Sequence, residues 1–232
     1  VLTVEHRYFG TSIAAGADWT HLTIEQSARD SHGIVEAFSS VYGGAFIGTG
    51  SSKGGLTALF HQQHFPEDLA GVVAYVAPIT FGLDDPRYVP FVASIGPSDG
   101  VCRLRVQDLA VELVERRAEA AQYLMLTDPD APALSLSALE AITAYGVLNF
   151  HWQFWQYYGS LEACFALPPR GAPIDQILPW FSVSVAGFFE LGRYDPELTP
   201  YSYQVRRELG GPSIDYSHLE EVFAEVDFSA LP

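Results

Sequence analysis

The pattern of apolar and polar positions predicts a strand, a loop and a helix at the start of the chain. Residues 1–5 form a run rich in β-branched side chains, which is typical of a buried strand, and a turn follows at residues 10–12. Thr23 and Gln26 have the spacing of a helix-capping box, and apolar residues then recur at helical intervals to about Val41. A pair of glycines follows and ends this predicted helix.

A second strand, turn and helix follow directly, and a further strand comes after them. Residues 45–48 are apolar, and a glycine-rich stretch leads from them into a helix that ends near Pro66. Residues 71–77 are apolar on both faces, as expected for a central strand of a parallel sheet that helices cover on both sides. The fold class is therefore predicted to be α/β over the first 80 residues.

After about Phe81 the pattern becomes mostly helical. Turns rich in Pro and Asp come first, and helical spacing then extends over residues 104–124, 135–157 and 197–209. Residues 181–191 are a weaker strand candidate. We therefore predict a core over residues 1–80, a helical cap or insertion over residues 81–215, and a segment over residues 216–232 that returns towards the core.

Composition narrows the function classes. Apolar residues make up 48% and charged residues 17% of the chain, which is a globular composition. A formal net charge of -16 argues against nucleic-acid binding, because phosphate contacts need clustered basic side chains, and Lys53 is the only lysine. Cys102 and Cys164 lack metal-like spacing and could form a disulfide or remain as two buried thiols. The sequence shows no membrane span and no signal peptide, and its first residues read as a strand already in progress.

Ser52 is the candidate that carries chemistry. It lies in a G-x-S-x-G motif with Gly50 and Gly54, between a predicted strand and a predicted helix. This turn presents a serine hydroxyl to a base, and small flanking residues let the strand and the helix approach each other. The backbone N–H of Lys53 would then be one donor to the oxyanion. We therefore predict Ser52 as a nucleophile.

The same glycines allow an alternative of a different class. Gly48, Gly50 and Gly54 form G-x-G-x-x-x-G, a spacing that can hold the pyrophosphate of a dinucleotide in an oxidoreductase. Such a site usually has an acidic residue at the end of the next strand, but no acid follows here before Asp84. An esterase or lipase on the same fold is a further alternative.

Several motifs in order closely resemble a known family. They are VEHRYFGTS at residues 4–12, LTIEQSARD at 22–30, FIGTGSSKGGLTALFHQQHFPE at 46–67, YVAPITFG at 75–82 and PYSYQVRRELG at 200–210. Together they resemble the secreted bacterial prolyl tri- and tetrapeptidyl aminopeptidases. The resemblance implies a serine exopeptidase that releases short proline-ended peptides from peptide N-termini, with an α/β-hydrolase core, a helical cap, and no metal or organic cofactor. It also implies peptide substrates, a secreted protein and Ser52 as the residue that forms the acyl-enzyme.

The family's catalytic Asp and His lie in stretches that this sequence lacks. We therefore expect a partial α/β-hydrolase core, truncated at both ends, with the triad Asp and His outside the chain and no activity in the chain alone. Asp195 and His218 are an in-order alternative within the chain. Their surroundings resemble the family's cap, which argues against them.

Three other groups have both a functional and a structural interpretation. Glu5 could bind the amine of a substrate, but hydrogen bonds that fix a turn are the more common role of such a charge. His61 and His64 are spaced like metal ligands, yet no partner completes a site. The aromatic run at residues 150–158 could line a proline pocket, although packing in the cap core is the more common role.

Overall fold

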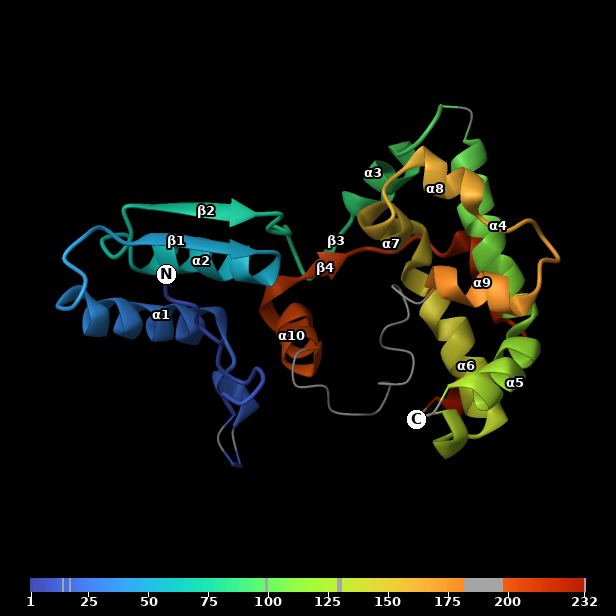
Figure 1. Ribbon diagram of the computed structural model, residues 1–232, viewed down its shortest axis with the longest axis horizontal. Coiled ribbons are helices and arrows are strands. Elements are labelled where there is room, and N and C mark those ends of the chain that lie inside the picture. Colours follow the sequence, from blue (N-terminus) through green and yellow to red (C-terminus); the bar gives the residue numbers. More distant parts are fainter. Residues whose placement is uncertain (14, 17, 99, 129–130, 182–197, 232) are drawn as a thin grey trace. The chain divides into compact units, whose positions relative to one another are not determined.

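The structure is a computed structural model that describes residues 1–231 apart from residues 14, 17, 99, 129–130 and 182–197. The chain divides into two compact units, which we call the sheet unit and the helical unit (Figure 1). The sheet unit contains Val1–Asp85 and the described part of Tyr194–Pro212, and the helical unit contains the described part of Pro86–Arg193 with Ser213–Pro232. Each unit is described by itself.

A small parallel sheet and two helices form the centre of the sheet unit. Their bounds are Ile24–Ser39 for α1, Ile47–Ser51 for β1, Lys53–His64 for α2 and Gly71–Tyr75 for β2, with a short 3-10 helix at Trp19–His21. β1 pairs in parallel with β2, from Ile47 opposite Gly71 to Ser51 opposite Tyr75. Helix α2 lies along this sheet and α1 packs on α2, as Figure 1 shows. The predicted order of helix, strand, helix and strand is confirmed.

The capping box begins α1 as predicted. The Thr23 side chain accepts a hydrogen bond from the backbone N–H of Gln26 at 3.1 Å. Such a bond satisfies one of the backbone donors that the first turn of a helix leaves free. The Glu208 carboxylate accepts from the backbone N–H of Ile24 at 2.6 Å, so residues distant in sequence help to fix the start of α1.

Two sequence predictions about the strands were wrong. Residues 1–5 form no strand and are all exposed, and Glu5 bonds to the following turn instead of joining a ladder. Residues 71–75 do form β2, but only one face of the sheet is covered in the described structure, so Val73 and Tyr75 are 46% and 61% exposed. Apolar composition alone cannot tell a strand covered on both faces from one covered on a single face.

Residues 198–212 return to the sheet unit. They form α10 at Leu198–Gln204, a π-helical turn at Val205–Leu209, and β4 at Gly211–Pro212, which pairs in parallel with β3 at Asp84–Asp85. The helix predicted over residues 197–209 is confirmed from Leu198 onward, and residue 197 lies outside the described residues.

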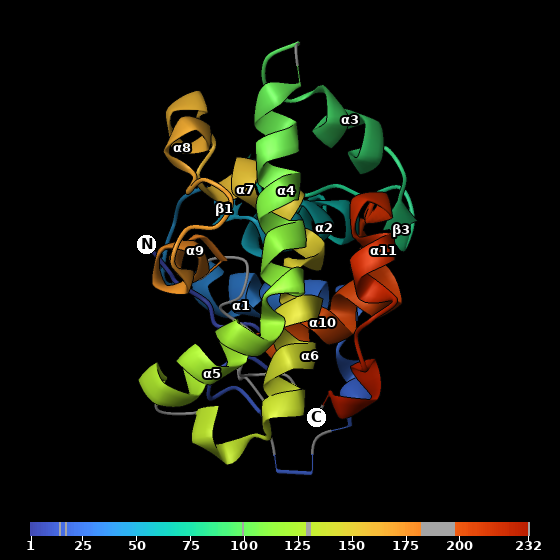
Figure 2. The same ribbon diagram turned by 90° about the vertical axis from the view of Figure 1, so that its right-hand side faces the viewer.

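The helical unit is built on α4 at Val101–Glu115, which Figure 2 shows along its length. The other helices are α3 at Tyr88–Ser94, α5 at Arg117–Thr127, α6 at Leu136–Gly146, α7 at Phe150–Tyr157, α8 at Leu161–Ala166, α9 at Ile174–Phe181 and α11 at Glu220–Phe223. Short 3-10 helices occupy Ala131–Ala133, Val147–Asn149, Ser217–Leu219 and Phe228–Ala230.

The helices predicted at 104–124 and 135–157 are confirmed, each with a break within it. The strand candidate at 181–191 lies outside the described residues except for Phe181, which ends α9.

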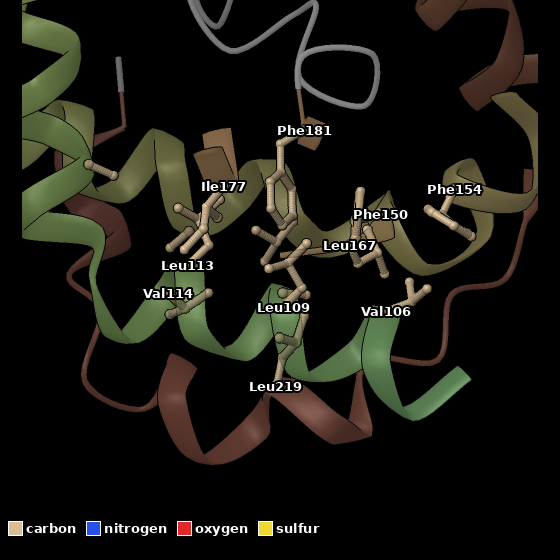
Figure 3. Close-up of a cluster of buried hydrophobic side chains, with 14 of the residues drawn as sticks. Val106, Leu109, Leu113, Val114, Phe150, Phe154, Leu167, Ile177, Phe181 and Leu219 are labelled. Carbon is tan, nitrogen blue, oxygen red and sulfur yellow. The ribbon is translucent and has the colours of Figure 1, made fainter. Parts of the chain in front are cut away.

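One large apolar core joins most of these helices, and a smaller cluster forms at Ala121, Ala131 and Leu139. Figure 3 shows Leu109 and Leu113 of α4 facing Phe150 of α7, Phe181 of α9 and Leu219, all of them buried. Leu219 belongs to the segment that we expected to return to the α/β core, but here it is packed in the helical unit. The division of the chain into a core, a cap and a returning segment, at residues 1–80, 81–215 and 216–232, stays a prediction. Among the described helices, none has the length and apolarity that crossing a bilayer requires.

Polar and covalent links also hold this unit together. Cys102 of α4 and Cys164 of α8 form a disulfide, which decides between the two alternatives left open by the sequence. The buried Glu112 carboxylate accepts from Arg116 at 2.7 Å and from the backbone N–H of Gly171 at 2.9 Å. A buried charge with several donors is stable where an unpaired one would not be, so Glu112 ties the loop before α9 to α4.

The disulfide closes a loop between residues 62 apart in sequence. From the entropy of the unfolded chain alone, such a loop stabilises by about 4 kcal/mol. We expect replacement of both cysteines by alanine to lower the free energy of unfolding of the helical unit by a comparable amount, measured in urea. Reductant should lower the wild-type midpoint and leave that of the double variant unchanged. A wild-type midpoint that does not move after complete reduction would contradict this role.

Candidate active site

Ser52 lies at a turn that few non-glycine residues adopt. It joins β1 to α2 with φ 51° and ψ -122°. An L-residue with positive φ is strained and persists only where the surroundings fix it. Here the Ser52 N–H donates to the carbonyl of Tyr75 at 2.9 Å, and the Ser52 carbonyl accepts from the N–H of Leu56 at 3.1 Å. The residue is exposed and its side chain does not cap α2, so the hydroxyl is available to a substrate.

Close contact between β1 and α2 produces this turn. A Cβ atom at Gly50 would lie 2.4 Å from the backbone carbonyl carbon and oxygen of Gly54, and one at Gly55 would lie 3.1 Å from Ala77 Cβ. A Cβ at Gly54 would meet nothing within 4 Å. The expectation that small residues let strand and helix approach therefore holds for Gly50, while Gly54 contributes its backbone rather than its missing side chain.

Lys53, whose backbone N–H is the predicted oxyanion donor, stands at the start of a helix. Lys53 is the first residue of α2, and the first N–H groups of a helix have no partner within the helix. The helix dipole adds partial positive charge at this end. The start of α2 can therefore stabilise negative charge that develops beside Ser52.

The Lys53 side chain joins the turn to an earlier loop. Its Nζ donates to His6 Nδ1 at 2.6 Å and lies 4.6 Å from the centre of the Phe9 ring. Burial lowers the pKa of Lys53 to about 8. Burial is the main cause that lowers the pKa of His6 to about 4. The charge of Lys53 also lowers this pKa, and Asp30 acts in the opposite direction. His6 is therefore neutral near pH 7 and accepts the hydrogen bond.

Charged residues of the same loop fix its conformation. The Glu5 carboxylate accepts from Ser12 Oγ at 2.5 Å and from Thr11 Oγ1 at 3.2 Å, and the Ser12 bond lowers the pKa of Glu5. Arg7 donates to both oxygens of Asp30, at 2.5 and 2.6 Å. These contacts agree with the structural interpretation of Glu5, in which hydrogen bonds hold the turn.

The histidines considered as metal ligands take part in a different arrangement. His61 Nε2 and His32 Nδ1 both donate to Asp68 Oδ2, at 2.7 and 2.8 Å, and His64 is exposed. Within the described parts of the chain, no three His, Cys, Asp or Glu side chains are placed to hold a metal ion. The sequence analysis missed His32 and Asp68, since they belong to different elements and no motif links them.

Only one of the two alternative triad partners belongs to the described residues. Asp195 lies outside the described residues. His218 belongs to the helical unit, where its ring centre lies 5.5 Å from that of His151. Both nitrogens of His218 are buried and have no hydrogen-bond partner among the described residues. Burial and then His218 lower the pKa of His151 to about 4, and burial lowers the pKa of His218.

The aromatic run at residues 150–158 contributes mainly to the core. Phe150 and Phe154 are fully buried, and Phe154 lies against Trp180 and Tyr158. Tyr157 is 55% exposed. The pocket function considered for this run stays a prediction.

Comparisons with known proteins agree on one family. A family model described as "PS-10 peptidase S37" matches residues 1–230. The chain is 34% identical over 228 residues to a protein of Streptomyces mobaraensis called "Prolyl tri/tetrapeptidyl aminopeptidase". That match covers 95% of this chain and 46% of the relative, so the chain spans about half the length of the curated protein. No solved structure matches significantly.

The two glycines of the motif offer a matched pair of variants. Gly50→Ala would force a Cβ into the backbone of α2, and overpacking of this kind costs about 1–3 kcal/mol or more. Gly54→Ala has open space and a better helix former, so it should be neutral or stabilise by up to about 1 kcal/mol. Urea unfolding of both variants measures the difference. Equal destabilisation by the two substitutions would contradict the assigned contact.

The buried histidine pair predicts sensitivity to acid. His151 has an ordinary pKa of 6.5 when unfolded and about 4 when folded, so the unfolded state binds more protons as the pH falls. The contribution of neutral His151 to the free energy of unfolding is complete above pH 6.5. It falls by as much as about 3 kcal/mol as the pH approaches 4. We expect His151→Phe to reduce the dependence of the unfolding free energy on pH between 7 and 4 and to leave the part that comes from His6, whose pKa is also lowered to about 4. A wild-type free energy that stays constant over this range would show that the pair titrates normally.

Proposed function

The chain belongs to the peptidase S37 family, and we propose that it carries the nucleophile of a secreted serine exopeptidase that releases short proline-ended peptides from peptide N-termini. The backbone of Ser52 carries this proposal, because a serine with positive φ between a strand and a helix is the geometry that a nucleophile elbow requires. The name of the Streptomyces relative supports the proline preference. The fold that we propose is a partial α/β-hydrolase core with a helical cap.

The proposed reaction proceeds through an acyl-enzyme. A histidine takes the proton of Ser52 Oγ as the oxygen attacks the carbonyl carbon of the proline residue, and the Lys53 N–H donates to the oxyanion. The carbonyl carbon then releases the amine of the remaining peptide, which receives the proton from the histidine. Water attacks the ester in the same way, so the short peptide leaves and Ser52 regains its proton. No metal ion or cofactor takes part in these steps.

We propose that the triad Asp and His lie outside these residues, since the stretches that carry them in the family are not found in this sequence. The alternative base, His218, has both ring nitrogens buried. A general base must reach the proton that it removes, so His218 would first have to become exposed. The chain alone is therefore expected to be inactive.

Net charge is consistent with a peptide substrate. With 28 acidic and 12 basic side chains, the protein attracts cationic ligands, among them the free amine at a peptide N-terminus. The family match favours a peptidase over the esterase and dinucleotide-binding alternatives. An esterase would prefer acyl esters to prolyl peptides, and a dinucleotide-binding protein would bind NAD saturably.

Labelling with a fluorophosphonate tests the nucleophile. We expect the protein expressed from its whole gene to be labelled, Ser52→Ala to lose all labelling, and the 232-residue chain to remain unlabelled. Ser51→Ala is the matched control, because Ser51 is the exposed neighbour at the end of β1 and should not affect labelling. Equal labelling of wild type and Ser52→Ala would refute the proposal. Labelling of the chain alone that requires Ser52 would instead make His218 a serious candidate for the base.

A further inference from the structure

Two segments that are far apart in sequence meet at the only lysine of the chain. Lys53 follows the proposed nucleophile directly, and its side chain reaches residues 47 and 44 positions earlier: it hydrogen-bonds His6 and lies over the ring of Phe9. The backbone N–H of Lys53 has a separate role from this side chain. Neither the serine motif nor the oxyanion requires a cation at that place.

A buried ammonium group needs compensating interactions, because transfer from water disfavours its charge. Here the compensation comes from the lone pair of neutral His6 and from the negative face of Phe9. Asp30, the carboxylate that acts on His6, is itself bound by both donors of Arg7. Among the residues that the structure describes, the cation is therefore held by two side chains of one loop and not by a salt bridge.

The loop that Lys53 contacts has a backbone that needs support. Tyr8 and Gly10 both have positive φ, at 67° and 52°. Within the loop, the Tyr8 N–H donates to the carbonyl of Ser12 at 3.0 Å. These bonds shape the loop, whereas the Lys53 contacts join it to the start of α2.

We propose that the Lys53 side chain is a positioning residue that holds the loop of residues 5–12 against the serine turn and thereby sets the reactivity of Ser52. The kinetic part of this inference rests on the proposed function. Deprotonation of Lys53 removes the cation–π contact and the charge of the hydrogen bond to His6. Because burial lowers the pKa of Lys53 to about 8, the loop should loosen as the pH rises through that value, while His6 stays neutral.

Rates of fluorophosphonate labelling in the protein expressed from its whole gene test this role. For wild type, we expect the second-order rate constant to fall above about pH 8. Lys53→Met should label on the order of tenfold to a hundredfold more slowly, since a small misplacement near a reacting group costs this much, and should lose the alkaline fall. Lys53→Arg keeps its charge at all these pH values, so it should restore most of the rate and remain reactive above pH 8. Wild-type rates and pH dependence in Lys53→Met would overturn the proposal.

A second measurement does not depend on catalysis. In the 232-residue chain, lysine labelled with ¹³C at Cε gives one side-chain signal, because Lys53 is the only lysine. We expect this signal to titrate near pH 8. In His6→Ala and Phe9→Ala it should move towards the ordinary lysine value of 10.5, because water then reaches the ammonium group and removes the desolvation that lowers its pKa, which outweighs the lost contact. A wild-type signal that titrates near 10.5 would refute the claim that the Lys53 side chain is held against His6 and Phe9. Titration near 8, together with no labelling of Ser52 in the protein expressed from its whole gene, would refute only the proposed function.

Discussion

The approach of β1 to α2 at Gly50 is the constraint on which the candidate site depends. No Cβ fits between Gly50 and the backbone of Gly54, so the chain turns from strand to helix within one residue. That residue is Ser52, whose positive φ is held by hydrogen bonds to Tyr75 and Leu56 at either side. The strain at Ser52 is thus maintained by the paired strands and the first turn of α2, which together are more stable than the turn alone.

Electrostatic contacts of the loop of residues 5–12 also stabilise this arrangement. The loop of residues 5–12 carries Glu5, His6 and Arg7 in succession, and each side chain has a different partner: Ser12, Lys53 and Asp30. The loop is therefore joined to its own turn, to α2 and to α1 at once. A molecule with a net charge of -16 places one of its few cations directly after the proposed nucleophile, where a negative charge would develop.

Local patterns predicted the parts of the structure that local physics decides. The Thr23 cap, the turn at Ser52 and the helices predicted at 104–124, 135–157 and 197–209 follow from spacing within a few residues, and the described structure confirms these elements. The strand predicted at residues 1–5 failed, because a strand needs a paired neighbour that composition cannot supply. The sequence likewise could not reveal the contact of Lys53 with His6 or the Cys102–Cys164 pairing, which tertiary packing brings together.

The central claim is that Ser52 forms a covalent intermediate, and trapping that intermediate tests it most directly. The protein expressed from its whole gene would be mixed with a prolyl peptide substrate, quenched in acid and digested with trypsin. Arg29 and Lys53 bound a tryptic peptide of residues 30–53 that contains Ser52. The account predicts that this peptide gains the mass of the acyl group and that fragmentation places it on Ser52. An acyl group on another residue, or turnover with no acylated peptide at any quench time, would contradict the account.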